Sequence, residues 1–341
     1  IRCNVRLQST LSIGNIAPMK QQRLSLMTSP NWHDYELLDS GNMRKYERFG
    51  QFRFIRPEPQ AMWQPRLDDA QWHSDGVFVA GSDKNSADDT DNSRDNGRWQ
   101  LADSLPESWQ MRYQSLRFLA RPTPFRHLGF FPEQAAHWEW CATAITAFQK
   151  QHKRAPRILN LFAYSGLASL HAAAAGAEVT HLDASKKAIA QAFENRDLSS
   201  MQDAPIRFIT DDATAFIDRE IRRQRHYDGI ILDPPKYGRG PKGEFWRIED
   251  DLTPLLQKCH QLLSPDALFL VLTIYAIRAS SLAAHYALAD LLEGAGGTLE
   301  SGELALQEPA FQPMGAASLA HNDAAAGRYV SQANFARWTS L

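Results

Sequence analysis

The chain has 341 residues, of which 43% are hydrophobic and 22% are charged, and its formal net charge is −2. This length is sufficient for a sheet domain of about 200 residues and one smaller module, and no apolar run approaches the length of about 18 residues that a membrane-spanning helix needs. The net charge alone gives no support for a nucleic-acid partner, and three scattered cysteines (Cys3, Cys141 and Cys259) are too few for a disulfide framework or a zinc site, so no metal centre is expected.

The first 33 residues are basic. They contain several Ser and Thr, no Asp or Glu, and four cationic side chains, at Arg2, Arg6, Lys20 and Arg23. Such a segment resembles an organellar transit peptide, mitochondrial more readily than plastid. A disordered extension accounts for the composition equally well, as does a wrongly assigned start, with Met19 or Met27 as the first residue. We therefore expect a mitochondrial location if residues 1–33 are a transit peptide and a cytoplasmic location otherwise.

Residues 34–128 have a different pattern. Short hydrophobic segments at 49–55, 76–80 and 116–120 are separated by Pro and Gly, which predicts a small β-rich module. Within it, residues 82–97 are acidic and polar without core-forming side chains, so we expect a disordered loop there. Basic side chains gather at 44–56 and at 219–225. The second group is expected on the exposed face of a helix, and neither group proves RNA binding.

Helices and strands alternate in the remainder of the chain, residues 129–341. Pro132 stands at the first position of a helix that carries Trp138, Cys141, Ile145 and Phe148 on one side. A strand at 157–162 is followed by a helix at 167–175, which Gly176 ends, and by a strand at 178–182. Ser185 caps the next helix, which carries Ala188, Ile189, Ala192 and Phe193 on one face.

Further elements follow in the same alternation. Strands are predicted at 206–209 and 229–232, a helix at 252–263, a strand at 268–274, and an antiparallel pair of strands at 298–306 and 328–338. Alternating strands and helices predict an α/β fold, a doubly wound, Rossmann-like sheet over residues 129–341.

An Asp-Pro-Pro sequence follows the buried strand that ends at Leu232. Asp233 therefore lies at the carboxyl end of a parallel strand, the edge at which open α/β sheets bind ligands. Pro234 and Pro235 remove two N–H donors and hold the backbone extended. A carboxylate and free carbonyl groups remain, and these acceptors suit an amine. A turn-capping Asp with no chemical role is the alternative reading of this short motif.

Several motifs, in this order, give the chain its resemblance to a known family. They are Gly-Phe-Phe-Pro-Glu-Gln at 129–134, Asn-Leu-Phe-Ala-Tyr-Ser-Gly at 160–166, an acid after each of the next two strands, and Asp-Pro-Pro-Lys-Tyr at 233–237. Together they resemble the class I S-adenosylmethionine-dependent methyltransferases, in the variant found in bacterial large-subunit (23S) rRNA methyltransferases. The turn at 160–166 departs from the commoner form, which has several glycines.

This resemblance implies S-adenosyl-L-methionine as the cofactor and assigns residues to its site. The cofactor-binding residues would be Asn160, Phe162, Ser165 and Gly166 of the turn, Asp183 for the ribose, Asp212 for the adenine amino group, and Phe131 and Gln134 as pocket lining. The catalytic residues would be Asp233 and the carbonyl of Pro234 as amine acceptors, with Tyr237 stacking on a base taken out of its helix. Lys236 displaces this aromatic by one position from the usual motif.

Nitrogen is the expected methyl acceptor. Related rRNA enzymes that methylate C5 of cytosine carry a nucleophilic cysteine after the fourth or the fifth strand, and this chain has none there. Cys259 falls within a helix and is expected to pack as a small hydrophobe. With an ordinary pKa of about 4, Asp233 would orient the amine and stabilise charge, and proton loss would follow transfer.

Residues 238–243 fit the pattern G-x-G-x-x-G, but their context does not fit a dinucleotide site. That fingerprint belongs at the first strand-to-helix turn, whereas these residues follow the fourth strand and contain Pro241. A mobile loop whose Arg239, Lys242 and Arg247 meet phosphates and an ordinary solvated loop are the two interpretations that remain.

The sequence therefore predicts an S-adenosylmethionine-dependent methyltransferase that acts on a base nitrogen of ribosomal RNA. A methyltransferase for a protein side chain or a small metabolite is the first alternative. A non-catalytic RNA-interaction protein is the second, and Asp233 argues against it because such a module needs no amine acceptor. The target nucleotide, the methylated atom and the oligomeric state are not specified by these motifs.

Overall fold

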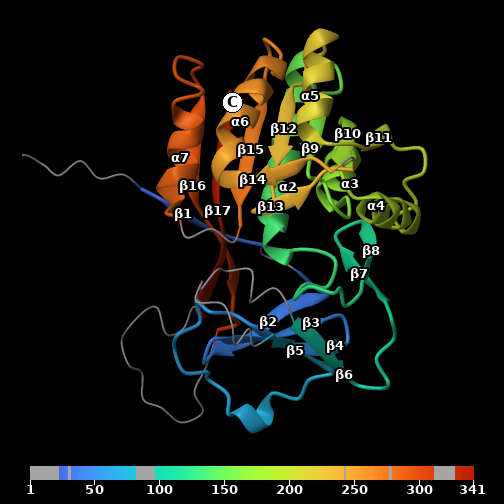
Figure 1. Cartoon of the computed structure of the whole chain (residues 1–341), viewed down its shortest axis with the longest axis vertical. Coiled ribbons are helices and arrows are strands. Elements are labelled where there is room, and N and C mark those ends of the chain that lie inside the picture. Colours follow the sequence, from blue (N-terminus) through green and yellow to red (C-terminus); the bar gives the residue numbers. More distant parts are fainter. Residues whose placement is uncertain (1–22, 30–31, 82–96, 242, 276–278, 311–326) are drawn as a thin grey trace, which may run out of the picture.

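The computed structural model describes residues 23–29, 32–81, 97–241, 243–275, 279–310 and 327–341. These residues form two lobes, an α/β domain and a β-rich N-terminal module, with the long strands β16 and β17 reaching from the first to the second (Figure 1). None of the helices in the described part of the chain is both long and apolar enough to cross a membrane.

The α/β domain is built on one eight-stranded sheet. Its strands lie in the order β1 (Ser25–Thr28), β16 (Thr298–Gln307), β17 (Tyr329–Thr339), β15 (Phe269–Ile274), β12 (Gly229–Leu232), β9 (Arg157–Leu161), β10 (Glu178–Asp183) and β11 (Ile206–Thr210). The five strands from β15 to β11 are parallel, and β17 is antiparallel to both of its neighbours. The predicted doubly wound sheet and its terminal antiparallel pair are confirmed.

Helices cover both faces of this sheet. They are α2 (Ala135–His152), α3 (Leu167–Ala174), α4 (Lys186–Leu198), α5 (Ala213–Arg222), α6 (Ile248–Leu262) and α7 (Ser281–Ala289). Side chains alternate along β12, so that Ile230 and Leu232 pack against α5, α6 and α7, whereas Ile231 packs with residues of α2 and α3. Apolar side chains on both faces explain why this strand reads as a continuous hydrophobic run.

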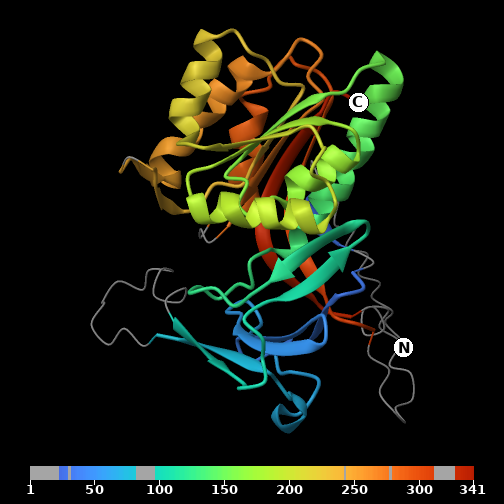
Figure 2. The same cartoon turned by 90° about the vertical axis from the view of Figure 1, so that its right-hand side faces the viewer.

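The N-terminal module contains a five-stranded sheet and a separate hairpin. The sheet consists of β2 (Tyr35–Gly41), β3 (Arg44–Phe49), β4 (Phe52–Pro57), β5 (Gly76–Ala80) and β6 (Gly97–Leu101), with a short 3₁₀ helix η1 (Asp69–Gln71), and the hairpin of β7 (Trp109–Tyr113) and β8 (Leu116–Ala120). Figure 2 shows this hairpin against the α/β domain, where the Leu119 N–H donates to the Asn195 side chain of α4 at 3.0 Å.

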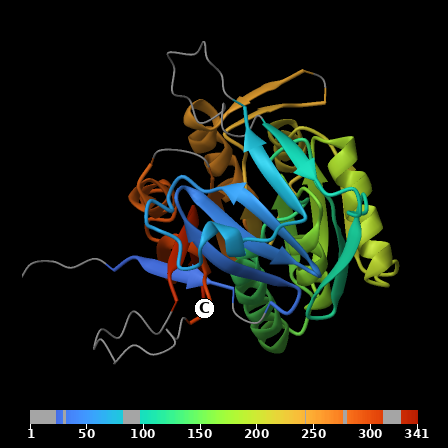
Figure 3. The same ribbon diagram turned by 90° about the horizontal axis from the view of Figure 1, so that it is seen from below.

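The module packs on the edge of the sheet at which the parallel strands end. Seen from below, its strands lie across the α/β domain (Figure 3). One hydrophobic cluster joins the lobes, because Tyr35, Phe49 and Phe54 of the module pack with Trp138 of α2 and Leu170 of α3. A second 3₁₀ helix, η2 (Pro132–Gln134), precedes α2 at this junction. The carboxyl edge of the sheet is therefore covered by the module.

The N-terminal part of the chain differs from the expectation in two places. Residues 49–55 are not one strand, because a turn at Gly50, with φ of +66°, separates β3 from β4. Ser25–Thr28, expected within a basic extension, form β1, which pairs in parallel with β16. Residues 1–22 lie outside the described residues, as does the expected loop at 82–97 except for Gly97, the first residue of β6.

Three further differences concern the α/β domain. The helix predicted at 252–263 begins earlier, at Ile248. Phe193 of α4 is 38% exposed instead of lying on the buried face, and its ring packs against Phe208 at 4.4 Å between centroids. The expected glycine loop at 238–243 belongs to a hairpin, because Gly238 and Arg239 lie in β13 (Tyr237–Arg239), which pairs with β14 (Phe245–Arg247), whereas Gly240, Pro241 and Gly243 lie in the connection. Lys242 lies outside the described residues.

Candidate active site

A pocket opens where β9 and β12 end. It is lined by Phe130, Phe131, Gln134, Trp138, Asn160, Phe162, Ala163, Tyr164, Ser165, Leu167, Ala168, Ile231 and Asp233. The structure therefore brings together the sequence-predicted residues of the turn at 160–165, the segment before α2 and the acid after β12. A second surface hollow, at the end of α5 around Gln224, contains none of these residues.

The turn between β9 and α3 has an unusual backbone. Phe162 and Tyr164 adopt left-handed conformations, with φ of 55° and 47°, although bulky residues rarely do so. Such conformations cost roughly 1–3 kcal/mol each and persist where the surrounding structure enforces them. Here the Tyr164 N–H donates to Asp183 at 2.9 Å, and the Ala163 N–H donates to the Leu182 carbonyl at 3.0 Å. These two hydrogen bonds hold the turn in its shape, although Gly166 is the one glycine in residues 160–166.

Residues outside the pocket lining constrain the backbone at Gly166 and the side chain of Asn160. Gly166 has φ of +88°, and a Cβ there would come within 2.9 Å of the Ala192 side chain of α4, so packing alone excludes other residues. The Asn160 amide donates to the Ser169 hydroxyl at 2.9 Å, and that hydroxyl lies 2.9 Å from His181 Nδ1. These buried contacts hold the Asn160 side chain in one orientation.

Asp183 and Asp212 lie at the same edge of the sheet, although neither is part of the pocket lining. Asp183 ends β10 and accepts hydrogen bonds from the backbone N–H groups of Tyr164 and Ser185. Burial raises its pKa above the usual value, against the lowering effect of these two bonds. Asp212 caps α5 and accepts from the Ala215 N–H at 2.8 Å. Each carboxylate keeps lone pairs that these contacts do not use.

Asp233 directly follows β12 and faces η2. Its Oδ2 accepts from the Gln134 amide at 3.0 Å, whereas its Oδ1 is buried and has no hydrogen-bond partner among the described residues. Burial raises the pKa of Asp233 well above its usual range, and the nearby Glu133 carboxylate raises it further. The expectation of an ordinary pKa near 4 is therefore wrong, because the cleft removes water from this carboxyl group.

Glu133 and Tyr275 complete the surroundings of Asp233, and neither is assigned a role by the sequence motifs. The Tyr275 hydroxyl donates to Glu133 at 3.1 Å, and its ring lies 5.4 Å from that of Phe131. Burial raises the pKa of Glu133, while the positive charges of Lys45 and Arg56 oppose this shift. Both cations belong to the N-terminal module, so the two lobes together determine the charge at this site.

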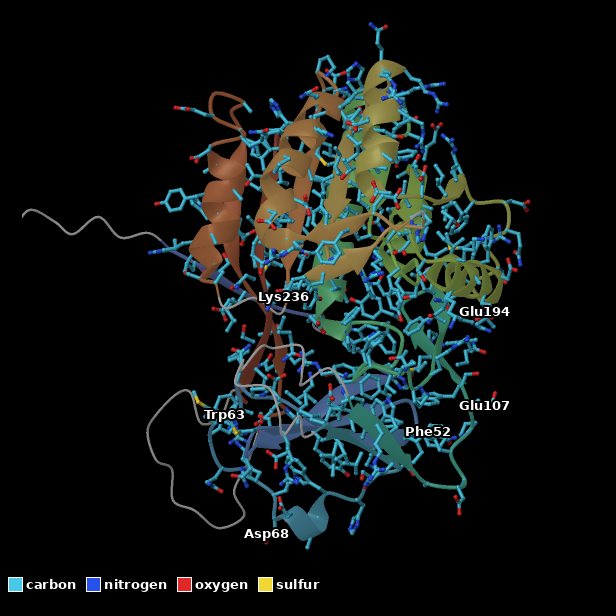
Figure 4. The ribbon with its side chains drawn as sticks, viewed as in Figure 1. Phe52, Trp63, Asp68, Glu107, Glu194 and Lys236 are labelled. Carbon is cyan, nitrogen blue, oxygen red and sulfur yellow. The ribbon has the colours of Figure 1, made fainter. Side chains whose placement is uncertain are left out.

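The hairpin β13–β14 holds the two prolines in place. Trp246 donates its indole N–H to the Pro235 carbonyl at 2.6 Å and packs against Phe162 at 5.2 Å between ring centroids. Pro234 is buried. Tyr237 is half-buried outside the pocket lining, with the Lys236 ammonium 5.4 Å from its ring. Figure 4 shows Lys236 at the end of the α/β domain that faces the module.

Thiols and metal ligands do not contribute to the described site. Cys141 and Cys259 are both buried in hydrophobic clusters, as expected for Cys259, and burial raises the pKa of Cys141 to about 12 and that of Cys259 further still. Cys3 lies outside the described residues. Among those residues, no group of three or more His, Cys, Asp or Glu side chains is placed to hold a metal ion.

Comparisons with known proteins agree with this geometry. A family model described as "Conserved hypothetical protein 95" matches residues 138–273. The crystal structure of the SAM-dependent methyltransferase from Agrobacterium tumefaciens is 44% identical, with a TM-score of 0.81, and the match covers 93% of this chain and 94% of that one. The putative methyltransferase SMU.776, complexed with SAH, shares the fold at 15% identity and a TM-score of 0.58, over 90% of this chain and 75% of that one.

A curated relative shares a shorter region. The "Ribosomal RNA large subunit methyltransferase K/L" of Shewanella baltica is 38% identical over 117 residues, which is 34% of this chain and 16% of that protein. The chain thus spans about a sixth of the length of this relative.

Proposed function

Because the chain belongs to the class I S-adenosylmethionine-dependent methyltransferases, we propose that it methylates a base nitrogen of ribosomal RNA. Relatives that match the central part of the chain are named for large-subunit ribosomal RNA, which supports RNA as the substrate. The choice of nitrogen as the methyl acceptor rests on one observation. It is the buried Oδ1 of Asp233, which lacks a partner among the described residues and suits an N–H donor.

The residues present fit the cofactor. Asn160, Phe162 and Ser165 line the pocket beside Asp233, and Asp183 ends the neighbouring strand β10 at the same edge. In this proposal Asp183 accepts from the ribose hydroxyls and Asp212 from the adenine amino group, since both carboxylates keep free lone pairs. When bound, S-adenosylmethionine supplies an electrophilic methyl group on its sulfonium.

Asp233 positions the acceptor amine and takes its proton. Its Oδ1 and the Pro234 carbonyl accept the two N–H groups of an exocyclic amine, which directs the nitrogen lone pair toward the methyl group. After transfer, the nitrogen carries a positive charge and must lose one proton. The raised pKa of Asp233 makes Oδ1 a better acceptor for this proton than an ordinary aspartate is. Gln134 holds the carboxylate in place through Oδ2.

The cysteines support nitrogen as the acceptor. Carbon methylation of a pyrimidine needs a thiolate that adds to the ring, and both described cysteines are buried with raised pKa values. Replacing Cys141 and Cys259 together by Ala should leave methyl transfer measurable. Trapping of a covalent adduct on RNA containing 5-fluorocytosine, and its loss in the double variant, would contradict nitrogen transfer.

The substrate is tested by product analysis. Purified protein is incubated with radiolabelled S-adenosylmethionine and unmodified large-subunit rRNA made by transcription, and the RNA is digested to nucleosides for mass spectrometry. We expect one new nucleoside, with the label on a base nitrogen. Label on protein or on small metabolites, with none on the RNA, would overturn the proposed substrate and leave the family unchanged.

A further inference from the structure

A row of aromatic rings connects the pocket to the surface of the molecule. Phe131 and Tyr164 line the pocket together with Asp233. The His127 ring contacts both, with centroids 5.1 Å from Phe131 and 5.6 Å from Tyr164. The Phe125 ring then stacks on His127, at 5.9 Å and an interplanar angle of 23°. We call Phe125, His127, Phe131 and Tyr164 the aromatic row.

Phe125 is exposed although its loop is firmly held. Its side chain is 53% exposed, whereas the other three members of the row are half-buried. The Trp99 indole N–H donates to the Thr123 carbonyl at 2.8 Å and to the Phe125 carbonyl at 3.1 Å. Arg56 donates to the Arg126 carbonyl at 2.9 Å. The loop thus presents a large apolar ring to solvent in a fixed position.

The covalent structure of the loop adds to this rigidity. Pro122 and Pro124 fix two backbone φ angles beside Phe125. The Thr123 hydroxyl donates to the His127 carbonyl at 2.9 Å, which closes the loop at its base. Holding an aromatic side chain in its binding conformation lowers the entropy lost on binding. A single exposed apolar side chain is common on protein surfaces, so the inference rests on the rigid loop and on the ring contacts that connect Phe125 to the pocket.

The charge of this region favours an anionic partner. Residues 108–132 contain four arginines, Arg112, Arg117, Arg121 and Arg126, and no Asp or Glu, and Arg121 forms an ion pair with Glu194 of α4. Burial, together with Arg56 and Arg126, lowers the pKa of His127 to about 3, so its ring is neutral at physiological pH. A neutral stacking ring near Arg56 and Arg126 suits a nucleic acid, which offers flat bases and phosphates at close spacing.

We propose that Phe125 is a stacking platform for the unpaired RNA base next to the target nucleotide, with the aromatic row leading from that platform to the methyl-transfer pocket. This inference rests on the proposed function, because it needs RNA as the substrate. It adds a contact to the neighbouring base on the N-terminal side of the cleft, beside the stack on the target base that the sequence motifs predict for Tyr237.

The test compares variants of the full chain at the exposed position. Phe125→Leu keeps the apolar character but removes the flat ring, and Phe125→Ala removes both. Phe125→Trp keeps a flat ring. Phe193→Ala is the matched control, because Phe193 is a partly exposed phenylalanine on α4, 38% exposed, outside the aromatic row. Filter binding to unmodified large-subunit rRNA gives the dissociation constant, and a methyl-transfer assay on the same RNA gives turnover.

We expect Phe125→Ala and Phe125→Leu to bind the RNA about 5- to 150-fold more weakly, the range typical of one base–aromatic stack. Phe125→Trp and Phe193→Ala should bind within about threefold of the wild type, and the S-adenosylmethionine affinity of all four variants should be unchanged. If the wild type methylates the RNA and Phe125→Ala binds it equally well, the platform is wrong and the proposed function stands. If the wild type methylates no RNA, the proposed function fails, and the platform fails with it.

Discussion

Asp183 is the residue on which the cofactor assignment depends most. Asp183→Ala should weaken S-adenosylmethionine binding by about 1.5–3 kcal/mol, because charge-assisted hydrogen bonds to the ribose are lost. Calorimetric titration measures this change. Asp203→Ala, at an exposed aspartate before β11, is the control and should bind the cofactor normally. Equal affinity of the Asp183 variant and the wild type would remove this residue from the cofactor site.

Glu133 is expected to set the pH dependence of methyl transfer. Asp233 must be ionised to accept a proton, and its raised pKa means that the rate falls with decreasing pH in a higher range than for an ordinary aspartate. Glu133→Gln removes the like charge and lowers this pKa, so the acid limb of the single-turnover rate should move to lower pH. The control is Glu107→Gln, at an exposed residue of the module (Figure 4). If the rate of Glu133→Gln falls over the same pH range as that of the wild type, Glu133 does not set the pKa of Asp233.

The sequence indicates those site residues whose signal lies in their immediate neighbours, and it does not indicate those whose role depends on distant partners. Asp233 and Asp183 stand at strand ends within recognisable motifs. Glu133 also stands in a motif, but its function depends on a hydrogen bond from Tyr275 and on the charge of Lys45 of the module, 88 residues earlier in the chain. A buried acid beside Pro132 at the start of a hydrophobic helix is the only local signal. Contacts between residues that are distant in the chain produce no periodic pattern in the sequence.

Among the elements, the hairpin β13–β14 supports the Asp-Pro-Pro segment through Trp246. Trp246→Phe keeps the packing on Phe162 but loses the hydrogen bond to the Pro235 carbonyl. We expect single-turnover methyl transfer to fall about 5- to 10-fold, equivalent to about 1 kcal/mol, with unchanged cofactor affinity. Phe245→Ala, at the neighbouring residue that is 63% exposed, should retain the wild-type rate. Equal rates for both variants would show that the indole does not position the prolines.

Strands and helices with strong local signals were predictable, and those that depend on distant pairing were not. The unit β9–α3–β10 follows from an apolar strand, an alanine-rich helix and a terminating glycine. By contrast, β1 is four residues long, lies in a basic segment and is stabilised by pairing with β16, more than 270 residues later. The turn at Gly50 does have a local signal, because Phe49 and Phe52 stand three residues apart and the alternation of Phe with other residues begins only at Phe52.

At the scale of the whole molecule, ion pairs of Arg328 join the module to the α/β domain. It contacts Glu308 through two nitrogens at 2.8 and 2.9 Å and Asp39 of the module at 2.8 Å, and both carboxylates are buried. Arg328→Met should lower the free energy of unfolding by about 3 kcal/mol, because the buried Asp39 loses its ion pair and the buried Glu308 keeps only a longer one, with Arg66 at 3.7 Å. Arg247→Met, at an exposed ion pair with Asp250, should lower it by less than about 1 kcal/mol.

Urea unfolding measures both changes. A loss no larger for Arg328→Met than for Arg247→Met would show that the interface does not depend on this contact. The sequence predicted two lobes but not their shared core. Tyr35 and Trp138 pack in one cluster although about a hundred residues separate them, and neither lobe alone shows a pattern that requires the other.

The central claim is that Asp233 acts on the acceptor nitrogen and not on the cofactor. Single-turnover methyl transfer to unmodified rRNA by Asp233→Asn and Asp233→Ala, measured beside cofactor affinity, tests it most directly. We predict a rate at least two orders of magnitude lower for both variants, on the order of 3 kcal/mol, with S-adenosylmethionine affinity nearly unchanged. Transfer at the wild-type rate by either variant would contradict the claim, and a matching loss of cofactor affinity would place Asp233 in the cofactor site instead.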